Sequence, residues 1–434
     1  MTNRPLPTTG ATTGLLEAIS FFRNPDFALE RFQSYGDVFE TRLLGQEMVF
    51  IRGDEAIGNL LNQSDSVEGW WPESVRQLLG MKSLANRNGP DHKARRRVVG
   101  QLFSRAALRE YTPAIITMVN DLVDELNNSQ QPIALAHRMR SFAFAVIAKT
   151  VLGLDDHNRE VLFKDFEIWT QALFSLPIAI PGTAFAKALA ARKRLLLHLR
   201  HRLSEIGPVA GHNTTQVCGL SRLCGGLDEH RQPLEDDDLA EQLLLLLFAG
   251  YETTASSLSC LMRALLLEPE VSDWLKPEID SLPWPPAESD LMAFETERSP
   301  RLNAVITEVM RLTPPVGGFF RRTRHAITLA GVDIPAGRVI QVALAASNRH
   351  GPGDDLGCFR PQRHLDKATP QQILRPFGGG ERVCLGQALA ELEIRLMGVG
   401  LLKQLRLRLV PDQDLSLRMV PSPVPRSGLL VVAD

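Results

Sequence analysis

The run F-G-G-G-E-R-V-C-L-G at residues 377–386 constrains this chain more than any other feature. Three successive glycines relax the steric limits on φ, so the backbone can curl around the side chain of Cys384. From Leu385 onward the apolar spacing predicts an amphipathic helix, whose first N–H groups and partial positive charge would favour a thiolate. A lone cysteine beside glycines is more often a small buried apolar residue. The pattern therefore leaves two interpretations open, a metal ligand and a packed thiol.

The order of residues within this run favours the metal ligand. It matches the haem-ligand signature F-x-x-G-x-R-x-C-x-G at every fixed position, so the chain resembles the cytochrome P450 family. The resemblance implies that the Cys384 thiolate is the axial ligand of a haem b iron. The residues of this run that it places around the cofactor are Phe377, Gly378, Arg382, Cys384 and Gly386.

Length and composition indicate a globular protein. The chain has 434 residues, 44% of them hydrophobic, and a formal net charge of -2. A near-neutral balance without a long basic run argues against nucleic acid as the main partner. Five cysteines without a C-x-x-C motif suit a reducing compartment, and the N-terminus lacks an apolar run of signal-peptide or membrane-span length. We therefore expect a cytoplasmic monomer without a membrane span.

The apolar periodicity predicts a mainly α-helical protein with small β-sheets. Strand-forming residues on both sides of Gly45 predict a hairpin. Residues 235–267 predict one long helix, on the order of 50 Å, with acids at its start. Shorter helices are predicted over residues 26–35 and 301–312. No internal repeat or linker is present, so we expect one domain over residues 1–434, with residues 1–25 as an N-terminal extension.

The predicted long helix contains a polar break, A-G-Y-E-T-T, at residues 249–254. Such a break can be a helix whose threonine hydroxyls donate to carbonyls one turn earlier. It also matches the P450 pattern A/G-G-x-D/E-T-T/S. The resemblance implies that Ala249 and Gly250 lie beside the haem, where the glycine leaves room, and that Glu252 and Thr253 deliver protons during dioxygen activation.

Two further motifs imply a structural triad. The E-x-x-R pattern at residues 308–311 alone predicts only an ion pair on one helix face. F-R-P-Q-R-H at residues 359–364 resembles the family's F-x-P-E-R-F, although Gln362 and His364 depart from it. The residues that the resemblance assigns to the triad holding the loop before Cys384 are Glu308, Arg311 and Arg363.

The two propionates of haem require cations at the pocket rim, and guanidinium groups suit carboxylates well. The family's positions imply His92, Arg96, Arg321 and Arg382 for this role. Lys93 and Arg97, in the same basic run as His92, are better explained as a solvated face.

The implied fold is the P450 fold, with haem between the long helix and the cysteine helix. The implied reaction inserts one atom of dioxygen into a C–H bond and reduces the other to water. The chain shows no flavin or iron–sulfur signature. We therefore expect a ferredoxin and a ferredoxin reductase as electron donors, docking near Arg95 or Arg97.

Several longer strings, including W-P-E-S-V-R-Q-L-L-G at residues 71–80 and P-P-V-G-G-F-F-R at 314–321, resemble the retinoic-acid-hydroxylase branch and its soluble bacterial members. The implied substrate is a long apolar molecule with a carboxylate, such as a retinoid, apocarotenoid or fatty acid. Arg76 is the candidate to bind that carboxylate, and an exposed helix arginine is the alternative. The implied pocket residues are Trp70, Trp71, Val75, Arg76, Phe174, Leu176, Val316, Gly317, Gly318, Phe319, Ser422 and Pro423.

Two other functions remain open at this point. One is a peroxide-using fatty-acid hydroxylase of the same fold, and the other is a non-catalytic haem-thiolate sensor or carrier. The pair Glu252–Thr253 argues against both, because the peroxide-using variant lacks an acid–threonine pair and a carrier has no need of one.

Overall fold

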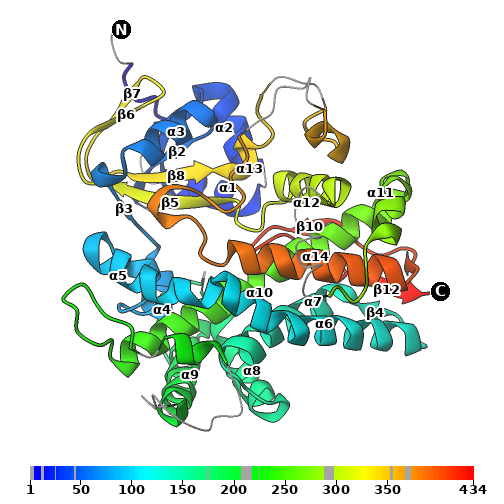
Figure 1. The fold of residues 1–434 in the computed structure, drawn as a ribbon. Coiled ribbons are helices and arrows are strands. Elements are labelled where there is room, and N and C mark those ends of the chain that lie inside the picture. Colours follow the sequence, from blue (N-terminus) through cyan, green and yellow to red (C-terminus); the bar gives the residue numbers. More distant parts are fainter. Residues whose placement is uncertain are drawn as a thin grey trace. The chain divides into compact units, whose positions relative to one another are not determined.

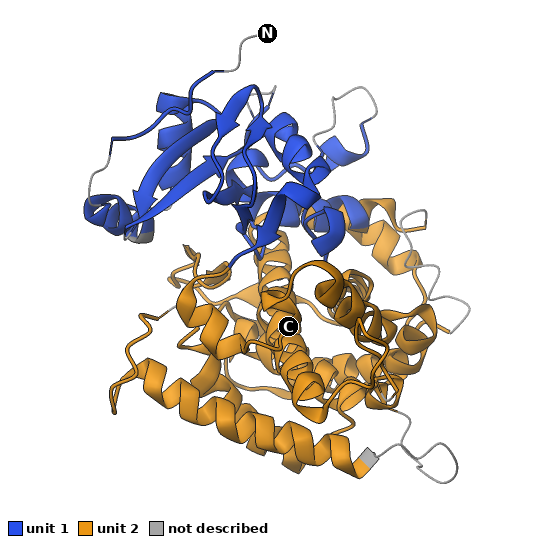
Figure 2. Cartoon of the chain, turned by 90° about the vertical axis from the view of Figure 1, so that its left-hand side faces the viewer, with its two compact units in different colours: residues 1–70, 303–384 blue, residues 71–302, 385–434 orange. Residues whose placement is uncertain are grey.

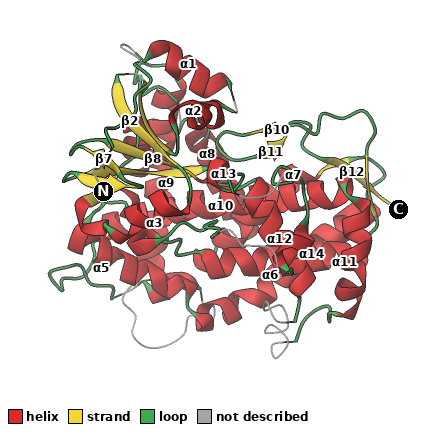
Figure 3. Ribbon diagram, turned by 90° about the horizontal axis from the view of Figure 1, so that it is seen from above, coloured by secondary structure: helices red, strands yellow, loops and turns green. Residues whose placement is uncertain are grey.

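The computed structural model describes residues 4–10, 14–24, 26–43, 45–173, 175–206, 218–223, 225–287, 298–351, 355–366 and 373–434. Helices dominate and the strands form small sheets (Figures 1 and 3), which confirms the predicted class. The chain divides into two compact units, each assembled from segments far apart in sequence (Figure 2). The first unit is Met1–Trp70 with Asn303–Cys384, and the second is Trp71–Leu302 with Leu385–Asp434. One domain over the whole chain stays a prediction.

The first unit is built on a five-stranded sheet in the order β1-β2-β8-β5-β3. The pairings are antiparallel except for β2 with β8, which is parallel. Leu43 pairs with Gln46 across the turn at Gly45, which confirms the predicted hairpin. The strands of this unit are β1 (Val38–Leu43), β2 (Gln46–Ile51), β3 (Val67–Gly69), β5 (Gly318–Thr323), β6 (Ile327–Leu329), β7 (Val332–Ile334) and β8 (Val339–Ala343).

Strand alternation gives this sheet two buried faces. Val49 and Ile51 of β2 pack into a cluster with α3 (Asp54–Asn62). The intervening Met48 and Phe50 pack into a second cluster with the aromatic residues of α2 (Phe27–Tyr35). Further helices assigned to this part of the chain are α1 (Leu15–Arg23), α12 (Pro300–Leu312), whose first turn belongs to the second unit, and α13 (Leu344–Ser347).

The predicted N-terminal extension contains structure. Helix α1 lies within it, and Glu17 of α1 accepts hydrogen bonds from Arg31 Nε at 2.8 Å, Arg31 Nη2 at 2.7 Å and Thr41 Oγ1 at 3.0 Å. These bonds attach α1 to α2 and β1, so this part of the extension belongs to the first unit.

The second unit is organised around α10 (Asp236–Leu267), which packs against α7, α9 and α14. This helix confirms the long helix predicted over residues 235–267. It is apolar and long enough to span a membrane by length and composition, but 72% of its most apolar stretch is buried by protein. The other helices are α4 (Glu73–Leu79), α5 (Gly89–Gly100), α6 (Arg105–Asn128), α7 (Leu135–Val146), α8 (Asp156–Thr170), α9 (Ala184–Ile206), α11 (Pro269–Ser281) and α14 (Gln387–Gln404).

Small antiparallel sheets complete the second unit. One has the order β4-β12-β9 and the other joins β10 to β11. Their strands are β4 (Ile133–Ala134), β9 (Leu407–Leu409), β10 (Leu417–Arg418), β11 (Val424–Pro425) and β12 (Leu430–Ala433).

The helix predicted after the cysteine, over residues 385–396, is present as α14. The helix continues beyond that string to Gln404, and its later part has different surroundings. Residues 396–401 are buried on every side, and the carboxyl of Glu393 is buried as well. A helix buried all round shows no polar face, and all but the first residue of this part of α14 lies beyond the string that carried the prediction.

Candidate active site

In the first unit the loop before Cys384 curls back on itself, as its glycines predict. Gly378 and Gly380 adopt φ values of 76° and 66°, in the left-handed region that favours glycine. Gly379 lies so close to Leu61 of α3 that an added Cβ would be 2.7 Å from Leu61 Cδ1. The Cys384 N–H donates to Phe377 O at 2.9 Å, and the thiol is exposed.

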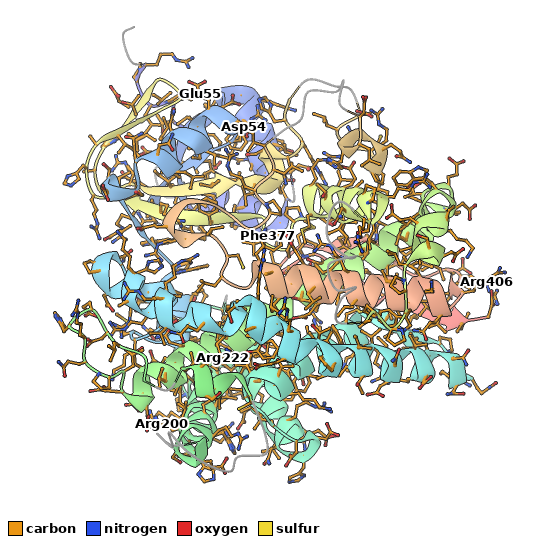
Figure 4. The ribbon with its side chains drawn as sticks, viewed as in Figure 1. Asp54, Glu55, Arg200, Arg222, Phe377 and Arg406 are labelled. Atoms are coloured by element: carbon orange, nitrogen blue, oxygen red, sulfur yellow. The ribbon has the colours of Figure 1, made fainter. Side chains whose placement is uncertain are left out.

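The start of this loop is attached to α3. Arg375 precedes Phe377 by two residues, and its Nη1 donates to Asp54 Oδ1 at 2.8 Å. Asp54 and Phe377 are labelled in Figure 4. Sequence reasoning missed this pair, because nothing in the local pattern connects Arg375 to a residue so distant in sequence. The contact connects the segment that leads to the cysteine with the start of α3.

Two arginines of the first unit concentrate positive charge. Arg321 on β5 is half-buried, with its guanidinium 4.6 Å from the Phe319 ring centroid. Burial, and next the positive charge of Arg382, lower its pKa to about 10. The Arg382 guanidinium lies against Gly69, where an added Cβ would be 2.6 Å from Arg382 Cζ. Two guanidinium groups that repel each other favour the binding of an anion between them. The two propionate carboxylates of haem fit this arrangement.

The predicted triad residues lie together in the first unit. Glu308 accepts from Arg311 Nε at 2.7 Å, Arg311 Nη2 at 2.9 Å and Arg363 Nε at 3.0 Å. His364 Nε2 lies 2.8 Å from Glu308 Oε2, and the Arg360 N–H donates to Oε1 at 3.0 Å. Burial alone would raise the pKa of Glu308, but the hydrogen bonds from Arg311, His364 and Arg360 lower it to about 2.

His364 occupies the position where the family pattern has phenylalanine. Its contact with Glu308 was not predicted, although the departure from F-x-P-E-R-F marked the position as unusual. Arg363 also binds Asp355, through Nη1 to Oδ1 at 3.1 Å. The buried Glu308 therefore contacts His364 and the Arg360 N–H in addition to the two arginines of the predicted triad.

In the second unit the polar break of α10 has one accessible face. Ala249 is exposed and Thr253 is half-buried, whereas most of the helix is buried. Thr253 Oγ1 donates to Ala249 O at 2.6 Å, the bond one turn back that a helical threonine commonly makes. That bond uses the hydroxyl proton as the donor, and the hydroxyl oxygen can still accept a hydrogen bond from another group.

Gly250 has a packing contact in the structure. A Cβ at this position would lie 3.2 Å from Ile147 Cγ1, in the π-helical turn Ile147–Val151 that follows α7. The glycine therefore allows α10 to approach that turn closely. Its predicted role of leaving room beside the haem stays a prediction.

Glu252 is buried, with 9% of the residue exposed, and its neighbour is Arg140 of α7. Arg140 Nη2 lies 3.6 Å from Glu252 Oε2. Burial raises the pKa of Glu252, while Arg140 and Arg418 act in the opposite direction. Sequence reasoning missed Arg140, because an arginine on a separate helix carries no signal of its partner.

The basic run of α5 is divided by burial. His92 is buried with 2% exposed, Arg96 is half-buried, and Lys93 and Arg97 are exposed. Arg95 is 6% exposed and binds Asp238 of α10, with Nη2 to Oδ2 at 3.0 Å. The guanidinium of Arg95 is therefore occupied inside the unit, whereas Arg97 is exposed, and docking of an electron donor near these residues stays a prediction.

Comparison with known proteins decides the family. The cytochrome P450 family model matches residues 16–426. The chain belongs to the cytochrome P450 family. A solved structure of cyanobacterial CYP120A1 with retinoic acid bound is 31% identical, covers all of both chains and superposes with a TM-score of 0.90.

Curated relatives extend the comparison. A putative cytochrome P450 120 of Synechocystis is 33% identical over 425 residues, which cover 96% of this chain and 93% of the relative. Zebrafish cytochrome P450 26B1 is 30% identical, with 95% of this chain and 83% of the relative covered. The predicted family, its branch, the P450 fold and the haem-thiolate cofactor are thereby confirmed, and the protein is a P450 monooxygenase.

The predicted pocket residues fall in both units. In the first unit Trp70 packs edge-on against Phe320, with ring centroids 5.4 Å apart, and Val316 is 42% exposed. Gly318 begins β5, where an added Cβ would be 2.1 Å from Val342 O, so the sheet itself requires a glycine there. Gly317 and the half-buried Phe319 flank it.

In the second unit Val75 is buried, Trp71 is half-buried and Leu176 is 64% exposed. Ser422 is buried, and Pro423 O accepts a hydrogen bond from Ser256 Oγ at 2.7 Å. The Arg76 side chain is 42% exposed and pairs with Glu73 at 3.2 Å. Phe174 lies outside the described residues. Convergence of these residues on one substrate stays a prediction.

Proposed function

We propose that this P450 hydroxylates a long apolar carboxylic acid, of the retinoid, apocarotenoid or fatty-acid class. The observation that carries the proposal is the likeness to CYP120A1 with retinoic acid bound, at 31% identity over the whole chain. Exposed apolar side chains at Leu176 and Val316 agree with an apolar substrate, because such groups commonly line small-molecule entrances.

Within this proposal each half of the site has its own task. Haem, when bound, supplies oxygen insertion. Cys384 would hold the iron through its thiolate, and Arg321 with Arg382 would bind the propionates. His92 and Arg96 would add to that binding, as the family's positions imply. In the second unit, the accessible Thr253 oxygen and the neighbouring Glu252 would move protons.

Glu308, Arg311 and Arg363 are proposed to hold the loop before Cys384. The buried hydrogen bonds around Glu308 support this role, because a charge enclosed by several donors resists rearrangement. Phe377, Gly378 and Gly386 would shape the backbone around the cofactor, and Ala249 with Gly250 of α10 would lie beside the haem, as the family's positions imply.

We propose a ferredoxin and a ferredoxin reductase as electron donors. Turnover with such a pair and NAD(P)H tests this directly. Product formed with hydrogen peroxide alone at the same rate would favour the peroxide-using alternative, and reduction without any product would favour a sensor or carrier.

Cys384→Ala tests the proposed ligand. The variant should load haem poorly and should lack the thiolate-type absorption band when reduced under carbon monoxide. Cys358→Ala is the matched control, since Cys358 is also exposed, and it should retain the band. A normal band in Cys384→Ala would overturn the assignment.

A ligand screen by difference absorption spectroscopy tests the substrate class. Retinoic acid or a long fatty acid should shift the haem spectrum of the parent protein. Arg76→Ala should weaken binding of the acid by about 1.5–3 kcal/mol and spare the corresponding alcohol, because a charged hydrogen bond is lost. Gln77→Ala, which also removes a partner of Glu73, is the control. Equal losses for acid and alcohol would exclude Arg76 as the anchor.

A further inference from the structure

The carbonyl of Leu78, in the last turn of α4, accepts hydrogen bonds from two other helices. Trp169 Nε1 of α8 donates to it at 3.1 Å, and Arg192 Nε of α9 donates to it at 2.9 Å. Leu78 and Trp169 are both fully buried. A carbonyl oxygen has two lone pairs, so both of its acceptor positions are used. The C-terminal end of α4 is therefore attached to α8 and to α9.

Arg192 also connects this end of α4 to α10. Its Nη2 forms an ion pair with Glu241 Oε1, and Glu241 Oε2 accepts a hydrogen bond from the Lys82 N–H at 2.7 Å. Gly80, which ends α4 with a φ of 96°, lies against this pair. An added Cβ at Gly80 would overlap both the guanidinium and the carboxylate. The turn after α4 therefore admits the ion pair because residue 80 is a glycine.

The segment that follows α4 is held along α10 by a buried side chain. Gln242 is fully buried, its Oε1 accepts from the Leu84 N–H at 2.8 Å, and its Nε2 donates to Lys82 O at 2.7 Å. Residues 82–84 are therefore fixed to α10, and α4 packs against α9 and α10 (Figure 1).

Helix α4 depends on such contacts for its position. It has seven residues, whereas isolated helices shorter than about 12–15 residues are marginal in water. Its N-cap residue, Pro72, makes no side-chain cap hydrogen bond. The contacts at its C-terminal end therefore contribute directly to where its side chains lie. One of these side chains is Arg76, whose carbonyl accepts from Asn86 Nδ2 at 3.0 Å.

We propose that Arg192 is a positioning residue for the substrate site, which holds α4 so that the Arg76 guanidinium can bind the carboxylate of an acid ligand. This inference rests on the proposed function, in which Arg76 binds the carboxylate of a long apolar acid. It adds a residue of α9 that acts through α4.

The shape of the guanidinium gives Arg192 this role. Its Nε and Nη2 lie in one rigid plane, so the bond to Leu78 O and the ion pair with Glu241 fix α4 relative to α10 in distance and in direction. The Arg192 and Glu241 side chains are 16% and 14% exposed, so water weakens their attraction less than at the surface. Binding of a carboxylate by a guanidinium depends on alignment. A shift of α4 therefore weakens binding of an acid more than binding of the corresponding alcohol.

The experiment compares Arg192→Met with Arg194→Met in the holoenzyme. Methionine keeps an apolar stem and removes every hydrogen-bond donor. Arg194 lies on the same helix and pairs with Asp165 of α8 at 2.6 Å, so its variant removes an equal charge from a pair that does not involve α4. Glu241→Gln is a milder change, because the amide oxygen can still accept from the Lys82 N–H, and it keeps the test decisive if Arg192→Met folds poorly. Haem content and the carbon monoxide spectrum report the fold of each variant.

In Arg192→Met the dissociation constant of retinoic acid, measured from the shift of the haem spectrum, should rise about tenfold, and that of the corresponding alcohol should rise less than about threefold. The backbone amides of residues 76–84 should exchange hydrogen faster, as measured by mass spectrometry of peptides. Glu241→Gln should change both measurements in the same direction by less. Arg192→Lys should restore them in part, because an ammonium lacks the second arm of the guanidinium. Arg194→Met should match the parent.

A double variant decides whether Arg192 acts through Arg76. In the Arg76→Ala background, Arg192→Met should weaken binding of acid and alcohol equally, because the carboxylate contact is already lost. Equal losses for acid and alcohol in Arg192→Met alone, the same extra loss of acid in both backgrounds, or unchanged hydrogen exchange in α4 overturns the inference. If the parent itself binds acid and alcohol equally, the proposed substrate class fails, whereas faster exchange in Arg192→Met still shows the hold on α4. The two failures are therefore distinguishable.

Discussion

Two buried glutamates, one in each unit, have opposite environments. Glu308 of the first unit receives hydrogen bonds from Arg311, Arg363 and the Arg360 N–H and contacts His364, and its pKa falls to about 2. Glu252 of the second unit has one cation at 3.6 Å, and burial raises its pKa. Similar burial therefore accompanies a lowered carboxyl pKa in one place and a raised one in the other.

The number and closeness of donors account for this difference. Several short charge-assisted bonds outweigh the cost of burying a carboxylate, whereas one long contact does not. A carboxyl that stays ionised at every physiological pH suits a structural ion-pair network. A carboxyl whose pKa is raised is better suited to proton transfer.

The largest effect is expected from Glu308→Ala. It leaves the guanidinium groups of Arg311 and Arg363 buried without their anion, at a cost of roughly 3–5 kcal/mol in the free energy of unfolding. Little folded holoprotein should form, as judged by soluble yield and haem content. Glu252→Ala is the matched control and should fold. A soluble, haem-loaded and active Glu308→Ala protein would refute the structural role.

Protonation in acid changes the stability of the fold in opposite directions at the two glutamates. The pKa of Glu308 is lowered from 4.5 to about 2 on folding, so its stabilisation is complete above about pH 4.5 and is lost as pH falls toward 2. Its share is on the order of 3 kcal/mol, at about 1.4 kcal/mol per pKa unit. The pKa of Glu252 is raised, so its protonation as pH falls favours the folded state.

Urea unfolding of the parent and of Glu252→Gln between pH 5 and pH 2.5 measures this difference. Both proteins should lose stability over the same window, because Glu308 contributes to the loss in both and Glu252 does not. Disappearance of the acid-dependent loss in Glu252→Gln would reverse the assignment of the two groups.

Sequence reasoning found the parts of this comparison that lie in local patterns. The long helix α10 was predicted from its apolar residues and the acids at its start, and Glu252 and Glu308 were found by fixed spacing within motifs. The residues that make the two glutamates different were missed. His364 meets Glu308 across 56 residues, and Arg140 meets Glu252 from another helix. Pairwise contacts of this kind depend on tertiary packing and leave no period or spacing in the sequence.

Burial also depends on tertiary packing. Lys93 and Arg97 are exposed as predicted, yet Arg95 of the same basic run is buried against Asp238, 143 residues away. The end of α14 is buried on every side, which periodicity alone cannot distinguish from a continued apolar face. Composition shows which residues can be buried, and packing decides which of them are.

His364→Phe sharpens the comparison with a smaller change. It restores the residue of the family's pattern and removes one partner of Glu308, so the free energy of unfolding at neutral pH should fall by about 1.5–3 kcal/mol. With one donor fewer the pKa of Glu308 should rise, and the acid loss of stability should begin at higher pH. His350→Phe, on a half-exposed surface histidine, is the control. If the free energy of unfolding and the pH range of its loss in acid were both unchanged, Arg311 and Arg363 would be sufficient to hold Glu308 ionised.

Glu252→Gln should have the smallest effect on stability and a clear one on turnover. Replacing a buried carboxyl of raised pKa by a neutral amide removes a charge that opposes folding, so the free energy of unfolding at neutral pH should be unchanged or rise by up to about 1 kcal/mol. The amide cannot take up and release a proton, so product formation should slow while haem content and the carbon monoxide spectrum stay normal. Urea unfolding and steady-state product assays on the same preparation check both parts. A loss of stability as large as that of Glu308→Ala would mean that both glutamates are structural, because only a carboxylate held by its partners is costly to remove.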